Sequence, residues 1–246
     1  MKPPPARTLR LAAKWLALLV LAGAASLAML AYARRHPEDV PWTKLDLTRP
    51  VGAFTGRKLA ALEREPGLCR ALLVEAGVVH AVLPPHENGP NCSYSDAVRL
   101  AAAGSRTTVL RSDAGMSCPV AAALTLWEWH VVQPAARRHF GRPVTQVEHL
   151  GTYSCRRING REDGDWSEHA TANAIDIAAF QLEGGRRVSV LADWERDPAA
   201  AAFLREVRDG ACRLFATVLS PDHNEAHRDH LHLDQGRGPG GWRACR

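Results

Sequence analysis

An uncharged apolar run near the N-terminus places the strongest constraint on how this chain can fold. Trp15 to Ala33 reads WLALLVLAGAASLAMLAYA, 19 residues without a charged side chain. As a helix rising about 1.5 Å per residue, the run would span roughly 28 Å, near the hydrocarbon thickness of a bilayer. Four basic residues precede it and two follow it: Lys2, Arg7, Arg10, Lys14, Arg34 and Arg35. This asymmetry keeps the N-terminus in the cytoplasm and exports the rest of the chain.

A cleavable signal peptide is the alternative interpretation of this run. Ala31-Tyr32-Ala33 has the small-residue pattern of a cleavage site. The run is longer than the apolar region of most signal peptides, which favours an uncleaved anchor. We therefore expect an inner-membrane protein with its C-terminal domain in the periplasm, or a protein released into the periplasm if the segment is cut. The expected divisions are a cytoplasmic basic segment 1–14, an anchor or signal 15–33, a linker and lead-in 34–65, and a domain 66–246.

The net charge of +5 comes mostly from the segment around the apolar run. Residues 1–39 contribute +4, and the rest of the chain is close to neutral. A basic face for nucleic acid would instead put its charge on the folded domain. We therefore expect the membrane, through the N-terminal helix, as a partner and exclude nucleic acid.

The six cysteines are spread widely, and none forms a CxxC pair: Cys69, Cys92, Cys118, Cys155, Cys212 and Cys245. A thiolate zinc knuckle or a thioredoxin-type site is therefore excluded. An exported domain reaches an oxidising compartment, which favours disulfides over reduced core cysteines. Sequence alone leaves the pairing open.

The domain mixes helical and strand patterns in no repeating order. Apolar periodicity and turn residues predict helices and strands at 57–80 (helix, broken at Pro66-Gly67), 78–83 (strand), 119–140 (helix), 144–153, 174–182 and 187–191 (strands), 199–216 (helix) and 228–234 (strand). This order indicates an α+β fold with a small antiparallel sheet and flanking helices, stapled by disulfides.

Three histidines within six residues form the first chemical signal. His230 and His232 are two apart, so on a strand their imidazoles share one face, and His227 lies just before them. A solvated histidine-rich loop is the alternative. A second pattern, His223-Asn224-Glu225-Ala226-His227, imitates H-E-x-x-H, but its glutamate is one place late, so we exclude it.

His169 and Asp176 form the second signal. Asp176 is flanked by alanines and isoleucines, where a carboxylate is costly unless it is paired or metal-bound. The alternative is a salt bridge from Asp176 to an arginine. Two histidines and one carboxylate suit Zn²⁺ and leave the fourth position open to water, as in catalytic sites. His230 would then be the base beside that water.

These residues resemble the LAS zinc metallopeptidases, which include D-Ala-D-Ala metallopeptidases, murein endopeptidases and hedgehog-like domains. The motif S-x-H-x-x-G-x-A-x-D matches Ser167, His169, Ala174 and Asp176, with Ala172 in place of glycine. The motif H-x-H matches His230-Leu231-His232. The resemblance implies a hedgehog- or peptidase-like fold, zinc bound by His169, Asp176 and His232, His230 as base, and His227 stabilising the transition state.

Residues 66–246 also resemble a bacterial family named for an extensin-like C-terminal domain. The resemblance rests on CPVAAALTLWEWHVVQPAARRHFG, YSCRRING, SEHATANAIDIAAF, FLREVRDGACRLF and HRDHLHLD. Arg156, within YSCRRING, stands where related peptidases carry an arginine near the substrate. It would hold a carboxylate or an oxyanion, or alternatively form a salt bridge with Asp176 or Asp234.

Together these features predict an exported, membrane-anchored, zinc-dependent amide hydrolase of the D,D-carboxypeptidase or endopeptidase type. The expected substrate is a peptidoglycan peptide or another component of the cell envelope. Two alternatives stay open: a zinc-containing module that binds cell-wall peptide without cutting it, and a structural envelope domain. Ala172 is the reason for the first, because its methyl group would cost roughly 1 kcal/mol or more if this position requires positive φ.

Overall fold

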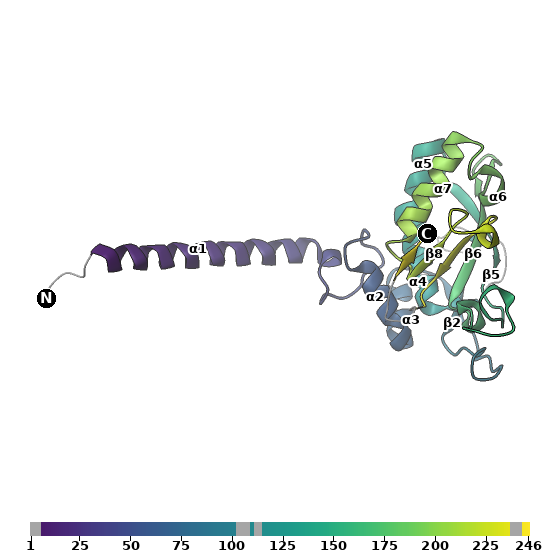
Figure 1. The fold of residues 1–246 in the computed structure, drawn as a ribbon, viewed down its shortest axis with the longest axis horizontal. Helices are drawn as coiled ribbons and strands as arrows, with labels where there is room; N and C mark the ends of the chain where they lie inside the picture. Colours follow the sequence, from purple (N-terminus) through teal and green to yellow (C-terminus); the bar gives the residue numbers. More distant parts are fainter. Residues whose placement is uncertain (1–5, 102–108, 111–114, 237–242) are drawn as a thin grey trace.

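A long N-terminal helix projects from a single folded domain (Figure 1). The computed structural model describes residues 6–101, 109–110, 115–236 and 243–246. Helix α1 (Ala6–Arg35) is followed in the domain by further helices: α2 (Thr55–Ala61), α3 (Pro66–Glu75), α4 (Cys118–Trp127), α5 (Gln133–Phe140), α6 (Val190–Asp193) and α7 (Pro198–Ala211). Short 3-10 turns and one π-helical segment join them.

The main sheet has seven strands in the order β10-β8-β9-β6-β5-β3, with β7 also pairing with β6. Its strands are β3 (Val109–Leu110), β5 (Val144–Gly151), β6 (Ala174–Leu182), β7 (Arg187–Ser189), β8 (Thr217–Leu219), β9 (Leu231–Asp234) and β10 (Ala244–Cys245). A smaller sheet has the order β1-β2-β4 and comprises His80–Val82, Ala97–Leu100 and Gly115–Ser117. The α+β class with a small antiparallel sheet is therefore confirmed. The edge pairs β10·β8 and β3·β5 are parallel and were not predicted.

A nearly continuous buried helix supports the sheet. Every residue of α4 is buried, and the Ser117 side chain accepts a hydrogen bond from Val120 N at its start. A π-helical turn (Glu128–Val132) joins α4 to α5, which ends at Gly141 with φ 67°. The predicted helix 119–140 is thus confirmed. Trp127 is fully buried and donates through Nε1 to Val207 O at 2.8 Å, so this residue packs in the core with its polar group satisfied.

Three predicted boundaries near the C-terminal half were wrong. The helix predicted to reach residue 216 ends at Ala211, because Cys212 to Ala216 turn into the short strand β8. The strand predicted from Arg228 begins only at Leu231, after a 3-10 turn at Glu225–His227. The strand predicted to reach Leu191 ends at Ser189, whose side chain starts α6 by accepting from Ala192 N.

All six cysteines form disulfides, as expected for an exported domain. The pairs are Cys69–Cys118, Cys92–Cys155 and Cys212–Cys245. The first joins α3 to the start of α4 inside the core. The second joins a surface loop to the segment after β5, and the third ties down the chain end beside β8.

Helix α1 contains the predicted membrane segment. Arg10–Arg35 is long and apolar enough to cross a bilayer, with a mean hydropathy of 2.2, and its apolar stretch is entirely exposed. Such a helix fits a membrane anchor or a signal segment, and with the disulfides it is compatible with an exported or membrane-associated protein.

Candidate metal centre

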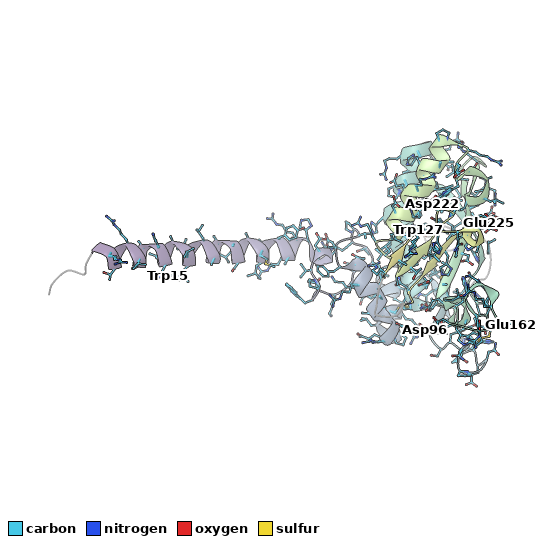
Figure 2. All side chains as sticks on the ribbon, in the orientation of Figure 1. Trp15, Asp96, Trp127, Glu162, Asp222 and Glu225 are labelled. Carbon is cyan, nitrogen blue, oxygen red and sulfur yellow. A yellow bond between two sulfur atoms is a disulfide. The ribbon has the colours of Figure 1, made fainter. Side chains whose placement is uncertain are left out.

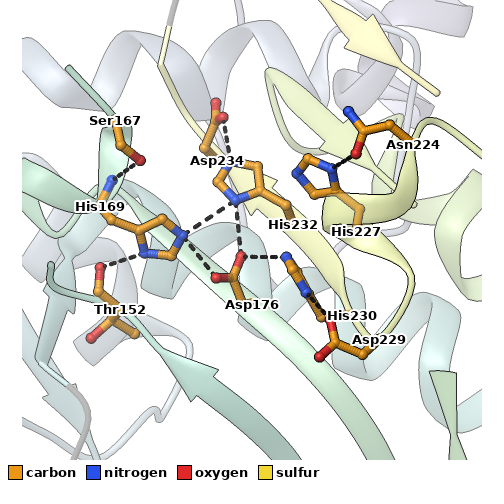
Figure 3. Close-up of polar contacts among 10 residues, drawn as sticks. All are labelled: Thr152, Ser167, His169, Asp176, Asn224, His227, Asp229, His230, His232 and Asp234. Atoms are coloured by element: carbon orange, nitrogen blue, oxygen red, sulfur yellow. Dashed lines mark hydrogen bonds and ion pairs between the residues drawn. The ribbon is translucent and has the colours of Figure 1, made fainter. Parts of the chain in front are cut away.

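Three of the predicted site residues converge at the centre of the main sheet (Figure 3). Asp176 on β6 lies directly opposite His232 on β9 in antiparallel register. His169 comes from the 3-10 turn Glu168–Thr171, which immediately precedes β6. The three side chains therefore meet because β6 and β9 are neighbours and the turn before β6 folds back over them. His169 and Asp176 are buried, and His232 is partly buried.

The spacing of the inward-facing atoms matches the face of a zinc tetrahedron. Two ligands at about 2.0–2.1 Å from one ion, at the tetrahedral angle, lie about 3.3 Å apart. His169 Nε2 lies 3.3 Å from His232 Nδ1 and 3.1 Å from Asp176 Oδ2. His232 Nδ1 lies 2.9 Å from Asp176 Oδ1. The two contacts to Asp176 use different carboxylate oxygens, and each separation is close to that between two nitrogen or oxygen ligands of one small ion.

The outward-facing nitrogens of both histidines fix which nitrogen carries the proton. His169 Nδ1 lies 3.1 Å from the Thr152 carbonyl, which can only accept. His232 Nε2 lies 2.9 Å from the Asp234 carboxylate. Both outer nitrogens must therefore donate, so the inner nitrogen of each ring is the one that would offer a lone pair to a metal ion or carry a further proton towards Asp176. Three lone-pair donors facing one point favour a cation between them.

The local electrostatics also favour positive charge at this point. Burial opposes a charged His232, but hydrogen bonds to Asp176 and Asp234 outweigh it and raise the pKa of that imidazole to about 9. Burial likewise opposes a charged Asp176, but hydrogen bonds from His169 and His232 hold its carboxyl pKa far below the usual range. The two carboxylates thus keep a positive charge here, whether a proton or a metal ion supplies it.

The turn that carries His169 ends at the unusual residue Ala172. This alanine is fully buried and adopts φ 56°, ψ 21°, the left-handed region that favours glycine. The position therefore does need positive φ. Its carbonyl accepts from Ser117 N at 2.8 Å, and Asn173 N donates to Glu168 O at 2.9 Å, so the backbone on both sides is held. The methyl group is accommodated without displacing the turn.

His230 and His227 border the three ligand candidates from the side of β9. His230 Nε2 lies 3.5 Å from Asp176 Oδ1, while its Nδ1 is 2.8 Å from Asp229 Oδ1. His230 precedes β9 by one residue, yet its ring reaches the cluster as the H-x-H spacing predicted. The His227 ring lies 5.2 Å from the His230 ring and contacts Asn224 Oδ1 through Nδ1 at 2.7 Å. Burial and the neighbouring histidines lower the His227 pKa to about 4, so this ring is uncharged at neutral pH.

An open cleft of about 710 Å³ exposes the cluster to solvent. Asp176, His232, His230 and His227 line it, together with Arg156 and Trp166 from the loop between β5 and β6. Arg156 is exposed, and within the described part of the chain it forms no ion pair with Asp176 or Asp234. The salt-bridge alternative for Arg156 is therefore not what the structure forms. The guanidinium is left available to the cleft.

The H-E-x-x-H imitation at His223 to His227 does not form a helical site. Only Glu225–His227 makes a short 3-10 turn, and Asn224 precedes it in an extended conformation. His223 and His227 still line the cleft, with ring centroids 5.6 Å apart.

Comparison with known families supports one assignment. The family model described as Extensin-like protein C-terminus matches residues 67–246. The chain belongs to this extensin-like family. The match covers the whole cleft and all three disulfides, so this extensin-like domain includes every candidate site residue. Searches of curated proteins and of solved structures found no match.

Sequence reasoning missed the residues that orient the ligand candidates. Asp234 follows His232 by two residues on β9, so the alternation H-x-H-x-D could have revealed it. Thr152 acts through its backbone carbonyl, which leaves no signal in the residue type. Asp229 and Asn224, the partners of His230 and His227, were likewise not singled out.

Proposed function

We propose that this extensin-like domain is an exported zinc-dependent amide hydrolase acting on peptidoglycan peptides. The observation that carries the proposal is the convergence of three lone-pair donors, with their outer nitrogens already engaged, at the base of an open cleft. A closed structural site would have a fourth protein ligand, whereas this arrangement leaves one side to the cleft. The resemblance of the ligand motifs to D-Ala-D-Ala metallopeptidases and murein endopeptidases supports the same chemistry.

His169, Asp176 and His232 would hold Zn²⁺. Such an ion lowers the pKa of water towards neutrality and polarises a carbonyl. The Thr152 carbonyl and Asp234 keep the two imidazoles in the tautomer that ligation needs.

The remaining residues would move protons and position the substrate. His230 donates from Nδ1 to Asp229, which leaves Nε2 free to take a proton beside Asp176. Arg156, which also lines the cleft, would hold a substrate carboxylate or the oxyanion. His227 is uncharged at neutral pH, so it would assist the transition state through hydrogen bonding and not through charge.

The location proposed is the inner membrane, with the domain in the periplasm. The apolar helix α1, the basic residues before it and the three disulfides support this placement.

The test is metal analysis of the purified full chain, followed by mass spectrometry of peptidoglycan digested with it. We expect about one zinc per chain and release of peptides cut at one type of amide bond. Asp176→Ala should abolish both metal content and cleavage, with circular dichroism confirming that the fold is intact. Full cleavage by folded Asp176→Ala would refute the proposal. Zinc binding and retention on peptidoglycan without cleavage products would instead identify a binding module.

A further inference from the structure

No spacer separates helix α1 from the folded domain. The last residue of α1 is Arg35, and the 3-10 turn Pro37–Asp39 begins two residues later. His36 N still donates to Tyr32 O at 2.8 Å, so the helical hydrogen bonding runs into that turn. If Trp15 to Ala33 cross the bilayer, the domain begins at the headgroups on its outer side.

Residues 36–56, which we call the collar, pack onto the domain instead of forming a free linker. Leu47 is 1% exposed and belongs to the hydrophobic core, and Val40 is 6% exposed. Lys58 of α2 donates to Pro37 O at 2.9 Å, and the Arg213 guanidinium donates to Val51 O. The collar is thus fixed to the domain at its beginning, middle and end.

One carboxylate ties helix α1 to the collar. Tyr32 in the last turns of α1 donates its hydroxyl to Asp39 Oδ2 at 2.7 Å, and Ala53 N donates to Asp39 Oδ1 at 2.8 Å. Gly52 allows this close approach, because a Cβ at that position would lie 2.5 Å from the Glu38 carbonyl carbon. These contacts hold α1 in one direction relative to the domain.

The same contacts argue against cleavage after Ala33. The candidate site Ala31-Tyr32-Ala33 lies inside α1, and its central residue is the one bound to Asp39. Proteolysis of a helix requires that it first open locally. Here opening would also break the link between Tyr32 and Asp39.

Two segments that contribute lining residues to the cleft lie on the side of the domain away from α1. Figure 1 places the long axis of the molecule horizontally, with α1 along it. Figure 2 shows Glu162 and Glu225 at the far end of the domain from α1. Glu162 belongs to the loop that carries the lining residues Arg156 and Trp166, and Glu225 to the turn that carries the lining residue His227. These two loops border the cleft, although Glu162 and Glu225 do not line it.

Side chains suited to a membrane interface surround the junction. Arg34 and Arg35 end α1, and Trp42 is 74% exposed. Thr43 donates its hydroxyl to the carbonyls of Pro37 and Val40, which folds the Trp42 turn back beside the end of α1. Exposed tryptophan and arginine are the residue types enriched at the headgroup level.

We infer that α1 remains attached as an anchor and that the collar holds the domain with the two loops that border the cleft, around Glu162 and Glu225, on the side away from the membrane. A domain of about 200 residues is roughly 40 Å across, so these loops stand tens of ångströms above the bilayer. The inference rests on the membrane location in the proposed function but not on catalysis. It favours, as the substrate class, assembled polymer of the envelope above the membrane over molecules still attached to lipid.

The test is energy transfer in the full chain reconstituted into bilayers with acceptor-labelled headgroups. A fluorescent amino acid is introduced either at position 42, replacing Trp42, or at position 225, replacing the exposed Glu225. We expect transfer from position 42 to exceed transfer from position 225 several-fold, with a narrow lifetime distribution at position 225. Gly52→Ala should broaden that distribution, whereas Gly67→Ala, whose Cβ meets nothing within 4 Å, should not.

Tyr32→Phe removes only the hydrogen bond to Asp39. If Gly52→Ala does not fold, Tyr32→Phe should broaden the lifetime distribution at position 225 in its place. Equal transfer from the two positions, or recovery from cells of a chain cut after Ala33, would overturn the inference. Because energy transfer needs neither metal nor turnover, this result is independent of whether the proposed hydrolysis is found.

Discussion

Asp234→Asn tests whether the outer hydrogen bond of His232 controls metal binding. Asp234 is 4% exposed and accepts from Gly236 N through Oδ1 at 3.0 Å while Oδ2 lies 2.9 Å from His232 Nε2. An asparagine that keeps the bond from Gly236 N must turn its NH₂ towards His232. The imidazole then accepts at Nε2 and carries its proton on Nδ1, the nitrogen that faces His169 and Asp176.

The expected cost follows from the role of such outer partners. Loss of a carboxylate behind a ligating histidine weakens metal binding by about 10- to 100-fold. That corresponds to about 1.4–2.7 kcal/mol of binding free energy. If the asparagine turns the other way, its NH₂ faces Gly236 N–H, so the buried hydrogen bond from Gly236 N is lost in that orientation.

The assay is a zinc titration of the full chain against a fluorescent chelator. Asp229→Asn is the matched control, because it removes the same charge close by but contacts His230, which is not among the three ligand candidates. We expect the dissociation constant of Asp229→Asn to stay within about twofold of the parent, since exposed charge contributes little. Equal weakening by both variants would show that net charge, and not the tautomer of His232, governs binding.

Three further predictions concern the surrounding structure. Ala172→Gly should raise the melting temperature slightly, because relief of the left-handed backbone, about 1–2 kcal/mol, exceeds the loss of one buried methyl, about 0.8 kcal/mol. Ala170→Gly, at a position that is also fully buried but right-handed, should lower the melting temperature. A shift of the same sign in both variants would contradict the reasoning. Two double variants each remove one disulfide: Cys92→Ser with Cys155→Ser, and Cys212→Ser with Cys245→Ser. Each should lower the free energy of unfolding by about 4 kcal/mol, because the unfolded chain gains loop entropy. Only the first double variant, next to Thr152 and Arg156, should also weaken zinc binding. Arg156→Ala should raise KM about tenfold or more through loss of a charge-assisted bond with zinc content unchanged, while Arg161→Ala, exposed and outside the cleft lining, should leave KM as it is.

The site was predictable from sequence to the extent that it follows strand alternation. His232 and Asp176 lie on paired strands. His230, two residues before His232, and His169, seven residues before Asp176, both contact the Asp176 carboxylate. The helix 119–140 was predictable because Pro119 marks the start and Gly141 the end of a long apolar pattern. These signals are local, so a single sequence carries them.

The missed elements depend on contacts distant in the chain. Strand β8 has only three residues and exists because β9 and β10 flank it. The collar has no periodicity, and its Leu47 becomes a core residue only through packing on the domain. The Cys92–Cys155 pairing reflects the approach of the loop after β1 to the segment after β5, which no spacing in the sequence encodes.

The structure also removes the physical argument that Ala172 disables the site. A substitution for glycine would matter to catalysis if the turn abandoned positive φ, because His169 would then leave the cluster. The turn keeps φ 56°, and the Ser117 amide, the Glu168 carbonyl and the Asn173 side chain hold it there. The strain therefore reduces stability by about a kilocalorie per mole and leaves the ligand triangle in place. In the proposed function, turnover would then depend on the cleft residues His230 and Arg156.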